Sequence, residues 1–442
     1  MTDSADAKPG KTKAGAAFIL FTVFLDMLSI GIIIPVFAPL IRHFTTTGTV
    51  SEAGLWVGIF GSCWGLAQFL FSPVQGAASD SIGRRPVVLA SNLGTGLDFL
   101  FMAMAPGLWW LLAGRIISGM TSASISTAYA YMSDVTEPQK RAKVFGLMGA
   151  AFGLGFIVGP SLGGILGGGL HWQFLTDHGL GFLNFQGGAR YPFFFAAGLS
   201  MLNFVYGFFV LPESLPKERR KPFSIHAANP IAAFRFLSRS GQVLRLSVMY
   251  LALMFAQSVF PTTMVLYALY RFGWGPSQVG LMLAAVGVLS AVVQAGLTGL
   301  IVKRFGERTT MFIGLSAGLI AFVWYGLAPS WEIFVAAMPI GALWGLAMPN
   351  IQALMTSKVD PKEQGTLQGA NMSLSSMATI FAPIAFGSIL SYVTRPGMPH
   401  ELSGAAFWLA AFCILLAVLL AGGVKAALKV EKAYDGDAPP AH

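Results

Sequence analysis

Residues 76–85, GAASDSIGRR, and residues 299–308, GLIVKRFGER, are two versions of one motif separated by 223 positions. Each version opens with a glycine and closes with a Gly-x-Arg triplet. The same offset relates a second pair of segments, in which Glu137, Pro138 and Gly146 align with Asp360, Pro361 and Gly369. One offset shared by separated motifs indicates an internal duplication, so we predict that the chain folds as two related halves.

The composition is that of a membrane protein. Hydrophobic residues make up 55% of the 442 residues and charged residues 11%, with a mean hydropathy of +0.67, whereas a soluble domain carries about 25% charged residues. The apolar stretches lack the period-two alternation of barrel strands. We therefore predict an all-α membrane protein with twelve transmembrane helices in two pseudo-symmetric six-helix bundles. The stretches long enough to cross a core of about 30 Å lie near 15–37, 53–75, 86–106, 108–131, 143–168, 191–211, 243–268, 278–301, 309–328, 331–356, 366–391 and 402–424.

The net charge of +9 reflects topology rather than nucleic-acid binding. With the N-terminus in the cytoplasm, all but five of the 28 Lys and Arg residues fall in cytoplasmic segments. This positive-inside bias predicts that both termini are cytoplasmic. Within a span lies Arg115, and the outside receives Arg42, Arg190, Arg271 and Arg395.

The spans and their connections define the predicted domains. The first span is too long for the apolar region of a signal peptide, and Cys63 and Cys413 lie inside spans, where a structural disulfide is not expected. The outside loop at 169–190 is either a short lid or, as we favour, a loop resting on lipid headgroups. The predicted limits are a disordered tail at 1–14, an N-terminal bundle at 15–211, a cytoplasmic linker at 212–242, a C-terminal bundle at 243–424 and a tail at 425–442.

The motif at 76–85 resembles the signature loop of the major facilitator superfamily, which commonly reads G-x-L-S-D-R-x-G-R-R; this chain departs from it at Ala78 and Ser81. Other stretches resemble the drug:proton antiporter branch and, within it, the tetracycline-efflux group: LDMLSIGIIIPVFAPL (25–40), AGRIISGMTSASISTAYAYMSDVTEPQKRAKVFG (113–146) and GLGFIVGPSLGG (153–164). The resemblance implies a bacterial inner-membrane antiporter that exports a hydrophobic or amphiphilic drug-like molecule, a tetracycline among the candidates, in exchange for protons.

The resemblance also implies a cytoplasmic latch between the halves. Its predicted residues are Gly76, Asp80, Gly83, Arg84 and Arg85. Span eleven begins near Gly365, and the partial positive charge of its helix N-terminus would attract the carboxylate of Asp80. The alternative is a basic turn that serves topology alone.

The fifth predicted span is rich in small residues and contains a proline. Small residues let helix backbones approach, and a proline bends a helix by removing a hydrogen bond. Close packing alone would account for them, but by the resemblance they are the antiporter motif, whose tight packing limits leakage. Its residues are Gly155, Gly159, Pro160, Gly163 and Gly164.

Three charged residues are predicted to lie within the membrane, all in the N-terminal half. At 1.5 Å per residue, Asp98 lies roughly 18 Å from the inner surface, level with Arg115, and Asp26 lies near the midplane. The tetracycline-efflux group has acids and an arginine at the matching positions. A static buried pair with Arg115 is the alternative for either acid, but one base cannot neutralise both. Because intramembrane acids are functional by default, we predict that Asp26, Asp98 and Arg115 form a proton-coupling or cationic-substrate site.

The C-terminal half has no charge inside its predicted spans. Hydrogen bonds across helices are the alternative for its intramembrane amides, which we predict to line the substrate pathway. Tetracycline pumps have an acid where this chain has Gly318 and a histidine where it has Ser290, so tetracycline itself is in question. The amides are Gln257, Gln294, Asn350, Gln352 and Asn371.

Enzyme chemistry is not indicated. The GKT at 10–12 lacks the upstream glycine and the strand of a phosphate-binding loop, and no His, Cys and carboxylate cluster has metal-ligand spacing. We expect no cofactor and no metal, with a proton gradient as the energy source. The expected partners are a small molecule, protons and the lipid bilayer, with no nucleic acid, and the expected state is a monomer. The alternatives are a proton-coupled transporter of an endogenous metabolite and a non-transporting receptor or lipid-handling protein.

Overall fold

The computed structural model describes residues 9–122, 124–137, 140–168, 190–223, 236–360 and 363–424, and every regular element in these ranges is helical. The N-terminal half contains α1 (Pro9–Phe44), α2 (Val50–Ile82), α3 (Arg84–Ala103), α4 (Leu108–Thr121), α5 (Ser124–Val135), α6 (Arg141–Gly168) and α8 (Tyr191–Val210). The turn η4 (Lys217–Arg219) follows it. The C-terminal half contains α10 (Gly241–Gln257), α11 (Val259–Phe272), α12 (Pro276–Ala291), η5 (Val292–Leu297), α13 (Thr298–Leu327), α14 (Trp331–Ala336), α15 (Met338–Leu343), η6 (Trp344–Leu346), α16 (Ala347–Thr356), α17 (Gln364–Val393), η8 (His400–Gly404) and α18 (Ala405–Ala421).

Ten helical stretches of the described residues are long and apolar enough to span a membrane. The stretch Pro276–Leu327 turns at Gly306 and contains two of the predicted spans. The predicted span 108–131 corresponds to α4 and α5. With these two adjustments the helices match the twelve predicted spans, and the all-α fold class of a multi-pass membrane protein is confirmed. The predicted domain limits stay a prediction, because residues 1–8, 169–189 and 425–442 lie outside the described residues.

The duplicated motif has the same backbone shape in both halves. Gly83 separates α2 from α3 with φ 115° and ψ 162°, and Gly306 bends α13 with φ 77° and ψ 164°. A positive φ is strained for residues with a Cβ, which explains why both copies keep glycine. We call the end of the molecule that carries these two turns the basic end.

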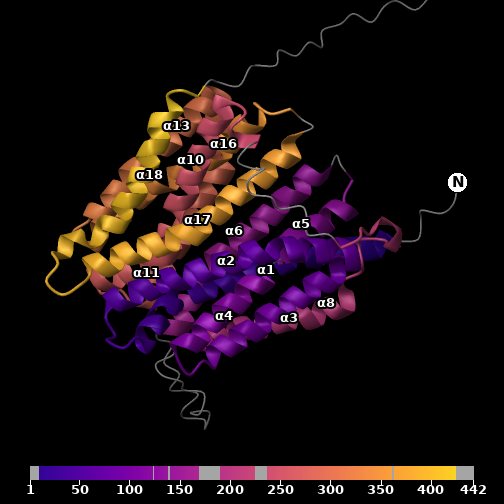
Figure 1. Cartoon of the computed structure of the whole chain (residues 1–442), viewed down its shortest axis with the longest axis horizontal. Helices are drawn as coiled ribbons and strands as arrows, with labels where there is room; N and C mark the ends of the chain where they lie inside the picture. Colours follow the sequence, from indigo (N-terminus) through magenta and orange to yellow (C-terminus); the bar gives the residue numbers. More distant parts are fainter. Residues whose placement is uncertain are drawn as a thin grey trace, which may run out of the picture.

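The two bundles pack against each other along two seams (Figure 1). In one seam α2 lies against α17, where the Ser51 hydroxyl donates to the Ser391 carbonyl at 2.6 Å. In the other, α6 lies against α12, where Ser277 donates to the Gly164 carbonyl at 3.1 Å. The seams are repeat-related, since Pro160 and Gly164 of α6 stand 223 positions before Pro383 and Gly387 of α17.

The tight contacts of the seams lie in the half of the helices remote from the basic end and reach mid-helix at Gly65 and Thr379. A Cβ added at Gly58 would lie 2.7 Å from the Pro383 carbonyl oxygen. A Cβ added at Gly76 or Gly149, nearer the basic end of α2 and α6, would meet nothing within 4 Å. The helices of the two bundles diverge toward the basic end in Figure 1. The conformation is therefore one in which the bundles are open at the basic end.

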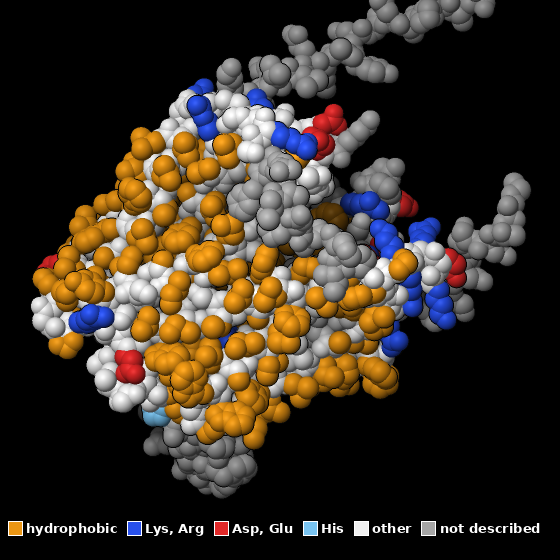
Figure 2. Space-filling view, viewed as in Figure 1, with side chains coloured by type: hydrophobic (Ala, Val, Ile, Leu, Met, Phe, Trp, Pro, Cys, Tyr) orange, Lys and Arg blue, Asp and Glu red, His pale blue; other side chains and the backbone are white. Residues whose placement is uncertain are grey.

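The surface agrees with a membrane environment. Figure 2 shows hydrophobic side chains over the flank of both bundles, and most of the visible Lys and Arg side chains along the upper and right margins. Lipid-facing side chains such as Phe209, Leu419 and Leu281 are 69–80% exposed. This pattern is expected where hydrocarbon rather than water surrounds the helices.

Candidate functional site in the bundle interior

Asp98 is the most deeply buried carboxylate of the described chain, with 2% of its surface exposed. It projects from α3 toward α4, where a Cβ on Gly114 would lie 3.2 Å from Asp98 Oδ1. The absence of a side chain at Gly114 therefore makes room for the carboxylate. The Arg115 guanidinium and the Ser118 hydroxyl lie close enough to interact with the Asp98 carboxylate. Neither Asp98 oxygen, however, completes a hydrogen bond with a described residue. A buried polar group left in this state is costly, and the role of Asp98 in proton coupling stays a prediction.

Arg115 of α4 lies beside Asp98, as the depth estimate from the sequence requires. Its guanidinium carbon is 4.0 Å from the centre of the Phe37 ring of α1, and its buried Nε has no hydrogen-bond partner among the described residues. The Arg115 cation is thus stabilised by the face of the Phe37 ring and by the negative charge of the nearby Asp98. It forms no direct ion pair with that acid. Phe37 was not predicted, and no sequence signal distinguishes it from the other apolar residues of the first span.

Asp26 belongs to a buried polar row on α1. Thr22, Asp26 and Ser29 recur at helical spacing and are at most 7% exposed. The Thr22 hydroxyl donates to Asn203 Oδ1 of α8 at 3.3 Å, so this row lies against α8. Asp26 on α1 and Asp98 on α3 are both buried within the N-terminal bundle.

The predicted gating residues meet within the N-terminal bundle. Arg84 Nη1 lies 2.6 Å from Asp80 Oδ1, and its Nε lies 3.1 Å from Oδ2 of Asp134 in α5. Among the described residues Arg84 is the only ion-pair partner of Asp80, whose side chain is 43% exposed. The predicted contact of Asp80 with the start of α17 is not made while the basic end is open; instead Glu363, at that start, pairs with Arg239 at 3.2 Å.

Glu213, just after α8, was missed in the sequence. Its carboxylate accepts the backbone N–H groups of Arg84 at 2.9 Å and Arg85 at 3.3 Å, the first residues of α3. Arg85 also donates from Nη2 to the Phe208 carbonyl at 2.7 Å. A carboxylate at a helix N-terminus satisfies free N–H groups and the dipole. The start of the linker therefore holds the signature turn in place, and the unusual position of an acid after an apolar span was the available signal.

The glycines of the antiporter motif serve two interfaces. Added Cβ atoms at Gly155 and Gly159 would lie 2.6 and 2.7 Å from backbone oxygens of α1, and one at Gly163 would overlap the Ile32 carbonyl. On another face of α6, an added Cβ at Gly164 would lie 2.7 Å from the Pro276 carbonyl oxygen of α12. Pro160 packs against Gly31 of α1 and lies beside Gly280 of α12. The motif is thus where the N-terminal bundle is packed internally and against its partner bundle.

The predicted pathway amides have different surroundings. Gln294 is exposed and lies in the π-helical turn η5, a feature frequent at functional sites. Asn350 is 3% exposed and donates to the Leu346 carbonyl of its own helix at 2.7 Å. Asn371 is equally buried, and its Oδ1 has no partner among the described residues. Gln257 is exposed at the end of α10.

Gln352 takes part in a polar cluster between helices. The Tyr250 hydroxyl of α10 lies beside the side chains of Gln352 in α16 and Ser375 in α17. The Ser375 hydroxyl also lies 3.7 Å from Met254 Sδ. Asn371 stands one helical turn before Ser375. The C-terminal bundle therefore offers neutral hydrogen-bonding groups, of which Tyr250 and Ser375 were not predicted.

An aromatic ring fills the space beside Gly318. A Cβ at Gly318 would lie 2.5 Å from Cδ1 of the Trp344 indole. Trp344 stacks edge-on against Phe322 with the ring centres 4.9 Å apart, and its Nε1 has no partner among the described residues. A side chain at Gly318 would have to displace the indole. This part of the C-terminal bundle is therefore aromatic, and the Trp344 N–H is available there as a donor.

The described ranges contain no group of three or more His, Cys, Asp and Glu residues that could hold a metal ion.

Comparisons with known proteins agree with this arrangement. The chain is 36% identical over 379 residues to the class C tetracycline resistance protein of Escherichia coli, which covers 86% of this chain and 90% of that protein. It is 34% identical over 382 residues to the class G tetracycline resistance protein of Vibrio anguillarum, covering 86% and 91%.

Solved structures show the same fold. A bacterial homologue of the human lysosomal transporter Spinster, in an inward-facing and unoccupied conformation, has a TM-score of 0.73 at 18% identity and covers 94% of this chain and 96% of that one. A D-xylose–proton symporter has a TM-score of 0.71 at 16% identity, covering 93% and 99%. The family model described as the Major Facilitator Superfamily matches residues 19–383 and 246–441. The resemblance noted in the sequence is confirmed, and the chain belongs to the Major Facilitator Superfamily.

Proposed function

We propose that this protein is a proton-coupled antiporter that exports a hydrophobic or amphiphilic drug-like small molecule by alternating access. The observation that carries the proposal is Asp98: a buried carboxylate without a completed hydrogen bond, next to Arg115, in a chain similar to tetracycline resistance proteins. An acid held in this way can take up a proton when the site faces one side of the membrane and release it on the other.

Proton coupling belongs to the N-terminal bundle. Protonation of Asp98 removes the negative charge beside Arg115, and the Phe37 ring then remains as the group stabilising that cation. Proton binding therefore changes which contacts hold α1, α3 and α4 together, and a ligand can bias two conformations only through such differential contacts. Asp26 is the second proposed proton site. The proton gradient supplies the energy, and the chemistry needs no cofactor.

The basic end is proposed to face the bacterial cytoplasm, with both termini on that side, because Lys and Arg accumulate there. The conformation described is then open to the cytoplasm, ready to accept substrate. Asp80 is half-exposed at this end, and it would meet the N-terminus of α17 when the bundles close. Arg84 and Arg85, tied to Asp134 and Glu213, would hold it in position. Because both seams lie within one chain, a monomer suffices.

The substrate is proposed to bind between the charged N-terminal bundle and the neutral C-terminal bundle. Gln294, Gln352 and Asn371 offer hydrogen bonds, and Trp344 offers an aromatic surface. Because Trp344 fills the space beside Gly318, the pocket differs from that of a pump with an acid at this position. We therefore expect an aromatic, drug-like substrate whose binding requires no acid within the spans of the C-terminal bundle.

The test compares Asp98→Asn with wild type and with Glu218→Gln, which removes an acid from the linker turn η4. Growth inhibition by a panel of antibiotics and dyes in an efflux-deficient host identifies a substrate. That substrate is then added to inverted membrane vesicles holding a pH gradient. Wild type and Glu218→Gln should dissipate the gradient, and Asp98→Asn should not. Undiminished uphill export by a correctly inserted Asp98→Asn variant would remove Asp98 from the coupling mechanism.

A further inference from the structure

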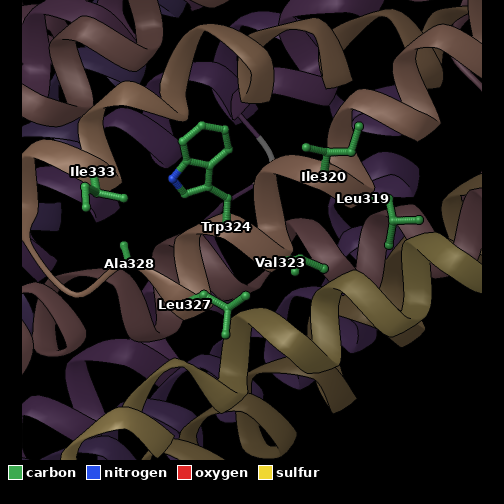
Figure 3. Close-up of a pocket in the computed structure, with 7 residues that line it drawn as sticks. All are labelled: Leu319, Ile320, Val323, Trp324, Leu327, Ala328 and Ile333. Carbon is green, nitrogen blue, oxygen red and sulfur yellow. The ribbon is translucent and has the colours of Figure 1, made fainter.

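The two bundles carry matching grooves on their outer surfaces. One groove, of about 480 Å³, lies where α13 ends and α14 begins (Figure 3). The other, of about 440 Å³, lies where α3 ends and α4 begins. The residues that line the first are Leu319, Ile320, Val323, Trp324, Leu327, Ala328 and Ile333. Those that line the second are Leu97, Leu100, Phe101, Met104, Ala105, Pro106 and Trp110.

The grooves are related by the internal duplication. Six lining residues of one stand 223 positions from lining residues of the other, from Leu97 with Ile320 to Trp110 with Ile333. Each therefore presents the last turns of one helix, a tight turn and the start of the next helix. In Figure 3 the Trp324 indole lies between the side chains of Ile320 and Ile333 around the open space.

Both grooves open to lipid close to a membrane interface. Leu327 and Met104, at matching positions, are 60% and 65% exposed. Leu327 ends, and Met104 directly follows, a helical stretch long and apolar enough to span a membrane. Exposed tryptophans stand at the start of the following helix in each case, Trp331 in one and Trp109 in the other. Tryptophan favours the headgroup level, so the grooves run from that level into the hydrocarbon.

At each groove an arginine donates to the backbone carbonyl of a lining residue. Arg271 Nε donates to the carbonyl of Ala328 at 3.3 Å, and Arg190 Nη2 donates to the carbonyl of Ala105 at 2.9 Å. Ala328 and Ala105 are repeat-related, whereas Arg271 and Arg190 are not. Arg190 is only 8% exposed, whereas Arg271 is half-buried, so Arg271 is the arginine that can reach a bound headgroup.

The positive charge at the first groove is not cancelled by an acid. Arg271 bonds with Nδ1 and the carbonyl oxygen of His400, each at 2.8 Å, and it forms no ion pair with a carboxylate of the described chain. Glu332, in the first turn of α14, bonds with Ser330 instead. A guanidinium with unmatched charge at the headgroup level attracts phosphate.

We propose that each groove binds one phospholipid from the leaflet at the end opposite the basic end, and that the groove beside Arg271 selects one of net negative charge. An acyl chain lies in each apolar groove, and at the first groove the phosphate lies at Arg271. Lipid tails are as apolar as the groove itself, so packing of the chain against Trp324 or Trp110 and the charge on the headgroup distinguish the bound lipid from the bulk. The bound lipids would hold the outer corner of each bundle during rocking of the two halves.

The test counts lipids retained by the full-length protein, by native mass spectrometry after transfer from nanodiscs of equal phosphatidylglycerol and phosphatidylcholine. Leu100→Trp and Val323→Trp fill the grooves at matching positions that are 37% and 38% exposed, so the bundle interiors stay intact. Each variant should lose one retained lipid, and the double variant should lose both. Leu419→Trp, at a lipid-facing position of α18 that is 69% exposed, should retain two.

The headgroup is tested separately. Arg271→Gln should lower the preference for phosphatidylglycerol over phosphatidylcholine at one site by about fivefold, the effect of one basic residue at a membrane surface. Arg395→Gln, an arginine outside both grooves, should leave the preference unchanged. Equal lipid counts in wild type and the double tryptophan variant, or equal retention of both phospholipids by wild type, would overturn the proposal. These readouts need no substrate, so they are independent of the proposed transport activity.

Discussion

Replacing Gly58 by alanine should shift the protein away from the conformation described here. The added Cβ would lie 2.7 Å from the Pro383 carbonyl oxygen and 3.2 Å from the Cα atoms of Ile384 and Gly387. All of these are backbone atoms of α17, which cannot rotate away as a side chain would. Overpacking of this kind costs about 1–3 kcal/mol, which corresponds to a population shift of about 5- to 150-fold. Because the clash exists only while the α2–α17 seam is closed, the state with a closed basic end should gain population.

The assay measures the opening of the basic end directly. Spin labels are attached through Ile82→Cys and Phe305→Cys, repeat-related positions that are 52% and 51% exposed, after both native cysteines have been replaced by serine. Double electron–electron resonance should show a larger short-distance population in the Gly58→Ala variant than in its parent.

Gly198→Ala is the control for helix propensity. Gly198 lies inside α8, and a Cβ there would meet nothing within 4 Å, so this variant gains the same intrinsic helix stability without a clash. The reasoning is refuted if Gly58→Ala inserts normally and gives the distance distribution of the parent. It is equally refuted if Gly198→Ala produces a shift of the same size.

Other contacts make further predictions. Phe37→Ala should weaken proton-coupled export by removing about 0.5–2 kcal/mol of cation–π stabilisation from Arg115, whereas Phe37→Trp should retain it; inverted vesicles measure both. Trp344→Ala should alter the panel of exported compounds by opening space beside Gly318, and growth-inhibition profiles measure the change. Glu213→Ala should cost about 1 kcal/mol by freeing the N-terminal N–H groups of α3, seen as a lower melting temperature in detergent, with Glu213→Gln recovering part of it.

Elements with strong periodicity or composition were predictable. Apolar length located the twelve spans, and the repeat of 76–85 at 299–308 located two turns that share a positive-φ glycine. Depth along the helices placed Asp98 level with Arg115, and the structure brings them together. These predictions succeed because they rest on distance along a single helix and on local backbone preference, both of which the sequence contains.

Contacts between helices were not predictable. Phe37 is one of many aromatic residues, and only the packing of α1 against α4 brings it to Arg115. Asp134 and Glu213 are separated from the signature turn by several helices' length of chain, yet both bind Arg84. Trp344 fills the space at Gly318 through a short helical turn that hydropathy cannot reveal. Side-chain partners distant in sequence depend on the rotation and crossing angles of the helices, which a single sequence does not specify.

The duplicated halves share their mechanical features and differ in charge. The glycine turns, the two seams and the outer grooves recur at one offset, whereas Asp26, Asp98 and Arg115 have no charged counterparts inside the spans of the second half. A repeat-related pair of seams lets the bundles rock about their contact without favouring either half. In the proposed mechanism, in contrast, protonation of Asp98 changes contacts in the N-terminal bundle only. The direction of coupling would then come from how α1, α3 and α4 transmit the state of Asp98 to the seams. One route of contact runs from Asp98 and Arg115 through Phe37 of α1 to the glycines of α6, which pack against α1 on one face and α12 on the other.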